Sequence, residues 1–299
     1  MKELRLRTWA LLGLFVFLGV ALAVVSERVD GLKAQLPPQG TTRPVAQAPQ
    51  RIIGVWQQPA SSFDKWKSLG VNTLVSFDQS ADRAKWMQAA QAAGLDYIVE
   101  ISPFDTAASV ANDPHRKGIL QTPDEPDSAG TPPATLQAFY DSHRWGCPIV
   151  VNFSGGYVLG IQKLNGQAIP TATYTAYCNA ADWIASDIYE VAGWNIPSEG
   201  GTNGGVSLLA ARQSVDRLGG IAPSKSQLAF IGVNKQNLNW LPNGGRSQTP
   251  NETWAVAGSM IPGNVGVVWF TCAFNPFTYD ACDAEQHARI AAINKVLSK

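Results

Sequence analysis

From Arg51 onward the sequence alternates short apolar runs rich in β-branched residues with longer stretches of helical period. A short apolar run predicts a buried strand, and apolar residues at every third or fourth position predict a helix that covers a sheet. This alternation is typical of β-α-β units, which place their strands side by side in a parallel sheet. We expect eight strands, at residues 52–56, 73–77, 97–101, 119–122, 149–153, 183–189, 228–233 and 266–271.

Helical stretches separate and close these strands, at residues 63–69, 81–93, 133–145, 173–180, 206–218, 251–259 and 283–297. Residues 51–299 number 249, close to the roughly 250 residues of one (β/α)8 barrel. An open, doubly wound sheet is the alternative, but no G-x-G-x-x-G follows the first strand, where a dinucleotide fold needs it. The pattern therefore predicts a single-domain α/β protein, a (β/α)8 TIM barrel over residues 51–299.

The first 50 residues have a different character. An uncharged apolar run at residues 9–25 follows three basic residues and contains Ala21-Leu22-Ala23, the small-x-small form of a cleavage site. The run just reaches the roughly 17–25 residues that span a bilayer, so residues 1–25 are either a signal peptide or a retained membrane anchor. Residues 26–50 are Pro-rich and predict an extended linker. We expect an exported domain, periplasmic, at the cell surface or secreted, with membrane contact only through the N-terminal segment.

Charge and cysteine content narrow the partners. The 23 basic and 23 acidic residues balance, which disfavours a nucleic-acid partner. Four cysteines fit an oxidising compartment, and the spacing favours disulfides Cys272–Cys282 and Cys147–Cys178, with buried free thiols as the alternative. No Cys-x-x-Cys occurs and the three histidines are scattered, so we expect no metal. No cofactor motif is present either, and we expect no cofactor.

In such a barrel the chemistry lies at the C-terminal ends of the strands. The side chains expected there combine carboxylates and amides, which bind hydroxyl groups, with aromatic rings, which pack on the apolar faces of sugars. Without a cofactor, the reaction that best suits this set is hydrolysis of a glycosidic bond by carboxylates. The expected substrate-binding residues are Trp56, Gln58, Asp78, Glu100, Asp124, Asp127, Asn152, Tyr189, Asn234 and Trp269.

The sharpest motif is the acidic turn 122–127, which reads Thr-Pro-Asp-Glu-Pro-Asp. Three carboxylates within four residues crowd negative charge and should raise at least one pKa, as a general acid requires. A solvated acidic turn is the plainer interpretation. A second acid, Asp187, lies in a mostly apolar strand, where an ionised side chain is costly unless it is paired.

Several segments in this order carry a family resemblance: Gly54-Val55-Trp56-Gln57-Gln58, Asp124-Glu125-Pro126-Asp127, Val151-Asn152-Phe153, Ser186-Asp187-Ile188-Tyr189 and Gly266-Val267-Val268-Trp269-Phe270. Together they resemble (β/α)8 glycoside-hydrolase-like proteins of the large retaining clan. The resemblance spans nearly all of residues 51–299. It implies that Glu125 is the acid/base at the end of the fourth strand, and that Asp187 and Tyr189 line a sugar site.

One departure bears on activity. The clan places a nucleophilic Glu at the end of the seventh strand, whereas residues 230–235 here read Phe-Ile-Gly-Val-Asn-Lys. Three routes remain: Asp187 or Glu100 acts with Glu125 in an inverting reaction, the substrate assists its own cleavage, or hydrolysis is lost and sugar binding kept. We expect an exported glycoside hydrolase acting on a polysaccharide or glycoconjugate, with Glu125 and Asp187 as catalytic residues. The alternative is a non-catalytic carbohydrate-binding or envelope protein on the same barrel.

Overall fold

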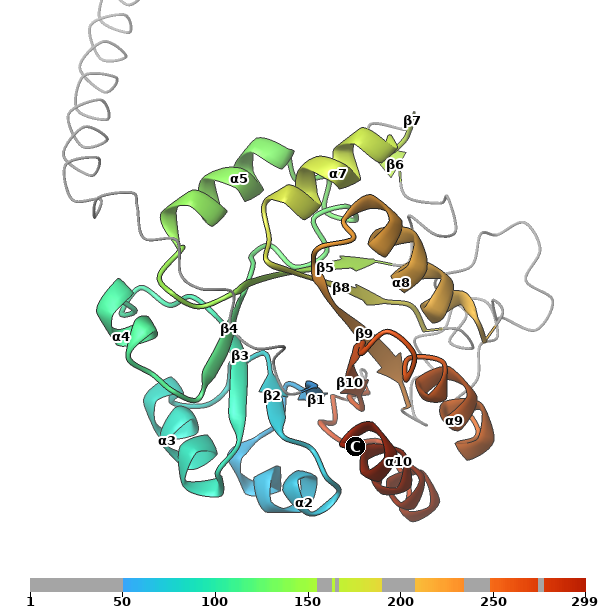
Figure 1. Cartoon of the computed structure of the whole chain (residues 1–299). Helices are drawn as coiled ribbons and strands as arrows, with labels where there is room; N and C mark the ends of the chain where they lie inside the picture. The colour runs from blue at the N-terminus through green and yellow to red at the C-terminus, as the bar shows by residue number, and fades with distance from the viewer. Residues whose placement is uncertain (1–50, 155–162, 165–166, 190–207, 234–247, 274–276) are drawn as a thin grey trace, which may run out of the picture. The chain divides into compact units, whose positions relative to one another are not determined.

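The protein folds into a closed barrel of eight parallel strands surrounded by helices (Figure 1). The structure, a computed structural model, describes residues 51–154, 163–164, 167–189, 208–233, 248–273 and 277–299. Around the barrel the strands follow the order β1-β10-β9-β8-β5-β4-β3-β2, so each strand pairs with its neighbours in the chain and the last pairs with the first. This closure confirms the predicted TIM barrel and excludes the open doubly wound sheet.

All eight predicted strands are present, with ends that shift by a few residues. The barrel strands are β1 Ile53–Trp56, β2 Thr73–Val75, β3 Asp96–Glu100, β4 Arg116–Leu120, β5 Ile149–Ser154, β8 Trp183–Asp187, β9 Ser226–Gly232 and β10 Gly266–Phe270. A small antiparallel pair, β6 Lys163–Leu164 and β7 Gln167–Ala168, follows β5.

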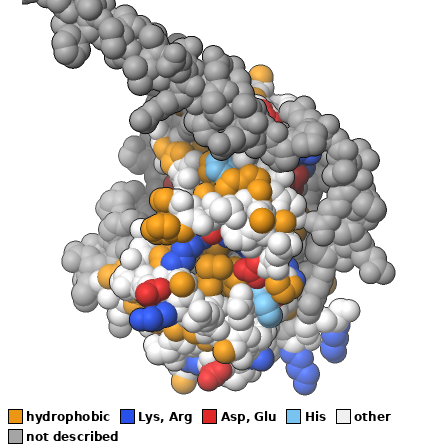
Figure 2. Space-filling view, turned by 90° about the vertical axis from the view of Figure 1, so that its left-hand side faces the viewer, with side chains coloured by type: hydrophobic (Ala, Val, Ile, Leu, Met, Phe, Trp, Pro, Cys, Tyr) orange, Lys and Arg blue, Asp and Glu red, His pale blue; other side chains and the backbone are white. Residues whose placement is uncertain are grey.

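The helices lie on the outside of the barrel, as the apolar periodicity predicts (Figure 1). They are η1 Ala60–Ser62, α2 Phe63–Ser68, α3 Arg83–Ala93, α4 Ala107–Ala111, α5 Pro133–Ser142, α7 Thr171–Asn179, α8 Ala210–Ile221, α9 Pro250–Gly258 and α10 Ala284–Leu297. The third connection, where Asn112, Asp113 and Pro114 oppose a helix, holds only the short α4. On the face shown in Figure 2, acidic and basic side chains are interspersed among hydrophobic and uncharged ones.

Alternate residues of each strand face opposite sides, which divides the core into two layers. The inner layer fills the barrel and includes Val75, Ile98, Val150 and Val268. The outer layer packs the other face of the strands against the helices and includes Trp269 on β10. This parity decides which side chains at the strand ends reach the barrel mouth.

The predicted Cys272–Cys282 disulfide is wrong. Although only ten positions apart, the two thiols point to different neighbours: the Cys272 Sγ lies 3.9 Å from the Trp56 carbonyl oxygen, and the Cys282 Sγ lies 3.5 Å from that of Val233. Burial raises the pKa of the Cys272 thiol to about 12, which keeps it protonated.

The predicted Cys147–Cys178 disulfide is wrong as well. The Cys147 Sγ donates a hydrogen bond to the Arg116 carbonyl oxygen at 3.4 Å, in a small apolar cluster beside β4 and β5. Cys178 is on α7 in a separate cluster, where burial raises its pKa to about 12. Cys147, Cys178 and Cys272 are buried and act as small packing residues, as the alternative interpretation had it, while Cys282 is only partly buried.

The predicted signal or anchor at residues 1–25 and the linker at 26–50 lie outside the described residues, and so does Asn234. Within the described part of the chain, no helix combines the length and the apolar character needed to cross a bilayer.

Candidate functional site

Carboxylates from separate strands converge at the C-terminal end of the barrel. On β5 and β8 the inward-facing residues Val150 and Ala185 belong to the barrel interior. Two positions further along each strand, the same parity turns Asn152 and Asp187 inward. The barrel interior thus changes from apolar to polar over two positions of each strand, and the acidic turn after β4 lies beside the polar end.

Asn152 joins two of these acids. Its Nδ2 donates hydrogen bonds to Asp124 Oδ1 at 3.1 Å and to Asp187 Oδ2 at 3.2 Å. Since Asn152 is only 2% exposed, these bonds hold both carboxyl groups in position. Its Oδ1 atom is buried and has no hydrogen-bond partner among the described residues. An unsatisfied buried acceptor costs about 1–3 kcal/mol, and native structures keep few of them.

Asp187 forms an acid pair with Glu125. The two side chains are hydrogen-bonded, and the Asp187 pKa lies well above its ordinary value, first because the group is buried and then because of the Glu125 charge. Asp124 adds a further negative charge with the same effect. Burial and the neighbouring charges therefore favour the protonated form of Asp187. Glu125 is the more exposed member of the pair.

Asp124 is the second acid with a shifted pKa. The dense protein surroundings of its carboxyl group raise the pKa to about 6, although the side chain itself is exposed to solvent. The charges of Glu125 and Glu100 raise it further, while the Asn152 hydrogen bond opposes them. Burial is therefore the main cause of the raised Asp124 pKa, and the crowding of negative charge that the sequence predicts makes a smaller contribution.

The backbone at this end of the barrel is strained. Gln57 after β1, Ser76 after β2 and Glu125 after β4 all have positive φ, at 45°, 62° and 47°. Non-glycine residues rarely adopt this region, and such strain concentrates at functional sites. Glu125 therefore combines a left-handed backbone conformation with a side chain that interacts with Asp187.

Aromatic side chains form one wall next to the acids. The Tyr189 ring lies 4.8 Å from that of Phe270, and the Trp56 ring lies 5.4 Å from that of Phe230. Gly232 makes room for this wall, since a Cβ there would lie 2.7 Å from Tyr189 Cδ1. Trp56 and Tyr189 both belong to this wall.

Glu100 ends β3 and is partly buried. It accepts hydrogen bonds from Ser76 Oγ at 2.6 Å and from the Phe77 backbone N–H at 3.3 Å. These bonds tie it to the strained segment after β2, while its charge still acts on Asp124. Glu100 therefore belongs to the acidic cluster, next to the acid pair.

Four other predicted residues serve the framework. Gln58 is fully buried, donates to the Tyr279 carbonyl oxygen at 2.8 Å and accepts from Trp66 Nε1 at 2.7 Å. Asp78 is 4% exposed and accepts from Tyr279 Oη at 2.8 Å, which fastens the segment after β10. Both residues support the barrel mouth without an exposed polar group of their own.

Asp127 and Trp269 face away from the mouth. Asp127 is fully buried beside α7 and accepts hydrogen bonds from Ser154 and Tyr174. Trp269 is also fully buried, and its Nε1 donates to Asn294 Oδ1 on α10 at 3.0 Å. The expectation that Trp269 forms a sugar platform is therefore corrected, because the inward neighbours Val268 and Phe270 place it on the outer face of β10.

Two features escaped the sequence analysis. Phe104, in the segment after β3, is 91% exposed, whereas the aromatic residues predicted to bind a sugar are Trp and Tyr only. Asp280, Cys282 and His287 come together before and within the first turns of α10. The pattern Asp-x-Cys-x4-His in the sequence was the available signal for this second cluster.

Two solved enzymes share the fold. The β-galactosidase from the psychrophilic Marinomonas ef1 has a TM-score of 0.55 at 10% identity, over 82% of this chain and 59% of the enzyme, so the chain spans less than two thirds of that protein. Active domain 2 of the thermostable chitinase from Pyrococcus furiosus has a TM-score of 0.50 at 11% identity, over 84% of this chain and 95% of the domain. No protein-family model and no curated protein sequence matches the chain. The resemblance to (β/α)8 glycoside-hydrolase-like proteins is thus confirmed for the fold.

Proposed function

We propose that the protein is an exported glycoside hydrolase that acts on a polysaccharide or glycoconjugate, with Glu125 as the residue that delivers the proton. The observation that carries the proposal is the hydrogen-bonded pair of Glu125 and buried Asp187 at the barrel mouth. A general acid needs a proton at neutral pH and access to the substrate. Burial favours the protonated form of Asp187, and Glu125 provides the access.

The pair changes the roles expected of these acids. In glycosidases that use two carboxyl groups, the groups stand about 5–5.5 Å apart in retaining enzymes and about 6.5–9.5 Å in inverting ones. Asp187 and Glu125 instead interact directly through their side chains. We therefore assign Asp187 as the partner that positions and protonates Glu125, and not as a separate base.

Cleavage then begins with transfer of the proton held by the pair, through Glu125, to the glycosidic oxygen, and the leaving sugar departs as an alcohol. The positive charge that develops at the sugar carbon is stabilised by the negative charges of Glu125, Asp187 and Asp124. Asn152 Nδ2 donates to both Asp187 and Asp124, which offsets the charge left on them. Water completes the reaction and returns a proton to the pair.

No acidic residue occurs in the sequence between Asp216 and Glu252, a stretch that contains all of β9 and the residues after it. A covalent route with a carboxylate after β9 therefore lacks its nucleophile. Either water attacks directly or a group of the substrate assists, and Asp124, with a pKa of about 6, has a suitable basicity to activate the attacking group.

The Asn152 Oδ1 and the exposed ring of Phe104 support a carbohydrate ligand. The amide oxygen lacks a partner among the described residues, so a sugar hydroxyl that reaches it would satisfy its hydrogen bonding. Phe104 presents an aromatic face to solvent on the same side of the barrel. The solved β-galactosidase and chitinase show that the fold accommodates carbohydrate chemistry in other proteins.

Export rests on the N-terminal segment, whose apolar run after basic residues is typical of a signal peptide or anchor. In this proposal the N-terminal segment makes the contact with the membrane, and the barrel lies outside the cytoplasm.

The test compares the full-length chain with Glu125→Gln on a panel of glycans, with release of reducing ends as the measurement. The substitution removes the proton donor but keeps its shape, so we expect activity to fall by about 10²–10⁴-fold. Glu285→Gln, at an exposed position of α10, is the matched control and should keep full activity.

Equal activity of Glu125→Gln and the wild type on a cleaved glycan would show that the assignment is wrong. If calorimetry detects glycan binding by the wild type but no reducing ends appear, the non-catalytic function applies. The missing acid after β9 is the observation that favours this second function.

A further inference from the structure

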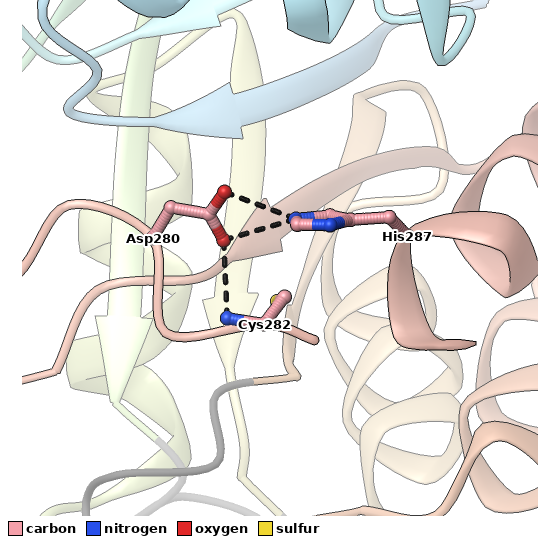
Figure 3. Close-up of side chains that lie close together, drawn as sticks. All are labelled: Asp280, Cys282 and His287. Atoms are coloured by element: carbon pink, nitrogen blue, oxygen red, sulfur yellow. Dashed lines mark hydrogen bonds and ion pairs between the residues drawn. The ribbon is translucent and has the colours of Figure 1, made fainter. Parts of the chain in front are cut away.

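A second cluster of chemically reactive side chains lies apart from the acid pair, where the chain runs from β10 into α10. Asp280, Cys282 and His287 each offer one donor atom, and these atoms all lie within 4.8 Å of one another (Figure 3). His287 Nε2 is 3.0 Å from Asp280 Oδ2 and 3.2 Å from Oδ1. All three residues are partly buried, so an ion can reach them from solvent.

Local structure explains why the three residues meet. Asp283 caps α10 by accepting a hydrogen bond from the Gln286 backbone N–H at 2.8 Å, which begins the helix at Ala284. His287 then follows within the first turns. Asp280 Oδ1 accepts from the Cys282 backbone N–H at 3.1 Å, and this short turn brings the carboxylate over the thiol and toward the imidazole (Figure 3).

We propose that Asp280, Cys282 and His287 bind a divalent transition-metal ion, with Zn²⁺ as the best match. Zinc prefers a combination of thiolate, imidazole and carboxylate in tetrahedral geometry, at about 2.3 Å for sulfur and about 2.0–2.2 Å for nitrogen and oxygen. Tetrahedral donors at these bond lengths lie roughly 3.3–3.7 Å apart. The His287 and Asp280 atoms are slightly closer than this, so a small outward rotation of two side chains admits the ion.

The donor set distinguishes zinc from Ca²⁺ and Mg²⁺, because those ions require oxygen ligands and a thiol offers none. Three protein ligands leave a fourth position for water. Binding replaces the Cys282 thiol proton with the metal–sulfur bond, and that proton is released to the buffer.

Lys65 is the group that competes with the ion. Its Nζ forms an ion pair with Asp280 Oδ2, and it also lies 4.8 Å from the centre of the Trp66 ring. When the metal takes one carboxylate oxygen, the ammonium group keeps the other oxygen or the ring as a partner. Trp66 also contacts the His287 ring edge-to-face at 5.7 Å, which restrains the imidazole.

The position of the site indicates what the ion does. The carbonyl oxygen of Tyr279, the neighbour of Asp280, accepts hydrogen bonds from Gln58 Nε2 at 2.8 Å and from Thr271 Oγ1 at 2.8 Å. Its hydroxyl group donates to Asp78. A metal that joins Asp280 and Cys282 to α10 would therefore fasten a segment that contacts the residues following β1 and β2 at the barrel mouth.

The test is a titration of the full-length chain, freed of metal by a chelator, with Co²⁺ and then Zn²⁺. Cobalt in a site with a thiolate ligand gives a sulfur-to-metal absorption band in the near ultraviolet. We expect one equivalent of Co²⁺ to produce this band and Zn²⁺ to abolish it by displacement. Cys282→Ser should lose the band. Loss of an outer-shell partner of a metal ligand already weakens metal binding by roughly 10–100-fold, so His287→Gln, which removes a ligand itself, should weaken Co²⁺ binding by at least that factor.

Cys147→Ser is the matched control, because Cys147 is a thiol in a separate cluster, and it should bind as the wild type does. A wild-type protein without the band, or a band of equal strength in Cys282→Ser, would overturn the proposal. If circular dichroism shows that Cys282→Ser does not fold, His287→Gln decides, and an affinity within about twofold of wild type counts against the site.

Discussion

Replacing Asp127 with asparagine should abolish a specific pH dependence of stability. Asp127 is fully buried, and its carboxylate accepts hydrogen bonds from the Ser154 backbone N–H at 3.1 Å, Ser154 Oγ at 3.1 Å and Tyr174 Oη at 2.9 Å. Burial outweighs these three bonds and raises the pKa from 3.8 to about 6. The folded protein therefore holds this proton more tightly than the unfolded chain does.

The size of the effect follows from the shift. The pKa rises by about two units, and each unit corresponds to about 1.36 kcal/mol, so the titration of Asp127 is coupled to about 3 kcal/mol of folding free energy. Because the folded pKa is the higher one, this stability is fully present below about pH 4. It is lost as the pH rises through about 6.

The assay is urea unfolding of wild type and Asp127→Asn between pH 3.5 and 7.5. Asparagine disturbs the hydrogen bonds by an amount that does not depend on pH, so the variant starts less stable at low pH. Its unfolding free energy relative to wild type should then rise by about 3 kcal/mol toward neutral pH. Asp64→Asn, at an exposed position in α2, is the control and should follow the wild-type curve. A constant difference between Asp127→Asn and wild type across this range would refute the reasoning.

Two further substitutions separate framework from site. Trp269→Phe leaves the buried Asn294 Oδ1 without its donor, so we expect the free energy of unfolding in urea to fall by about 1–3 kcal/mol and glycan binding to stay unchanged. Weaker glycan binding at unchanged stability would contradict the placement of Trp269. Gly232→Ala puts a Cβ 2.7 Å from the Tyr189 ring, which is backed by Phe270, so we expect a loss of about 1–3 kcal/mol and weaker glycan binding by calorimetry. Gly220→Ala is the matched control, since its Cβ would meet nothing within 4 Å, and an equal loss of binding there would count against the aromatic wall.

Some differences between the predicted and the observed elements have a local cause. The β4 strand begins at Arg116, earlier than the predicted residue 119, because Arg-Lys-Gly does not read as apolar. Gly118 nonetheless faces the barrel interior, where a Cβ would lie 3.1 Å from Val150 Cγ2. Trp269 is a similar case, since the strict alternation of β10 already places it opposite Val268 and Phe270.

Other errors have a tertiary cause. Cys272 and Cys282 are close in sequence, yet their thiols meet the carbonyl oxygens of Trp56 and Val233, which belong to other segments. The direction in which each thiol points depends on how the chain after β10 packs against β1 and β9. The distance between the two cysteines in the sequence carries no information about this packing.

The sequence by itself determined the barrel, because apolar residues repeat every two positions in a strand and every 3.6 positions in a helix, and both repeats can be read from a short stretch of sequence. It also determined which end of the barrel is polar, since Asn152, Asp187 and the acidic turn all follow apolar strand segments. Only the tertiary structure decided which acids touch. Asp187 and Glu125 lie 62 positions apart and become a pair because the closed sheet places the end of β8 near the turn after β4. A pKa depends on distance and burial, and both exist only after the strands have closed into a barrel.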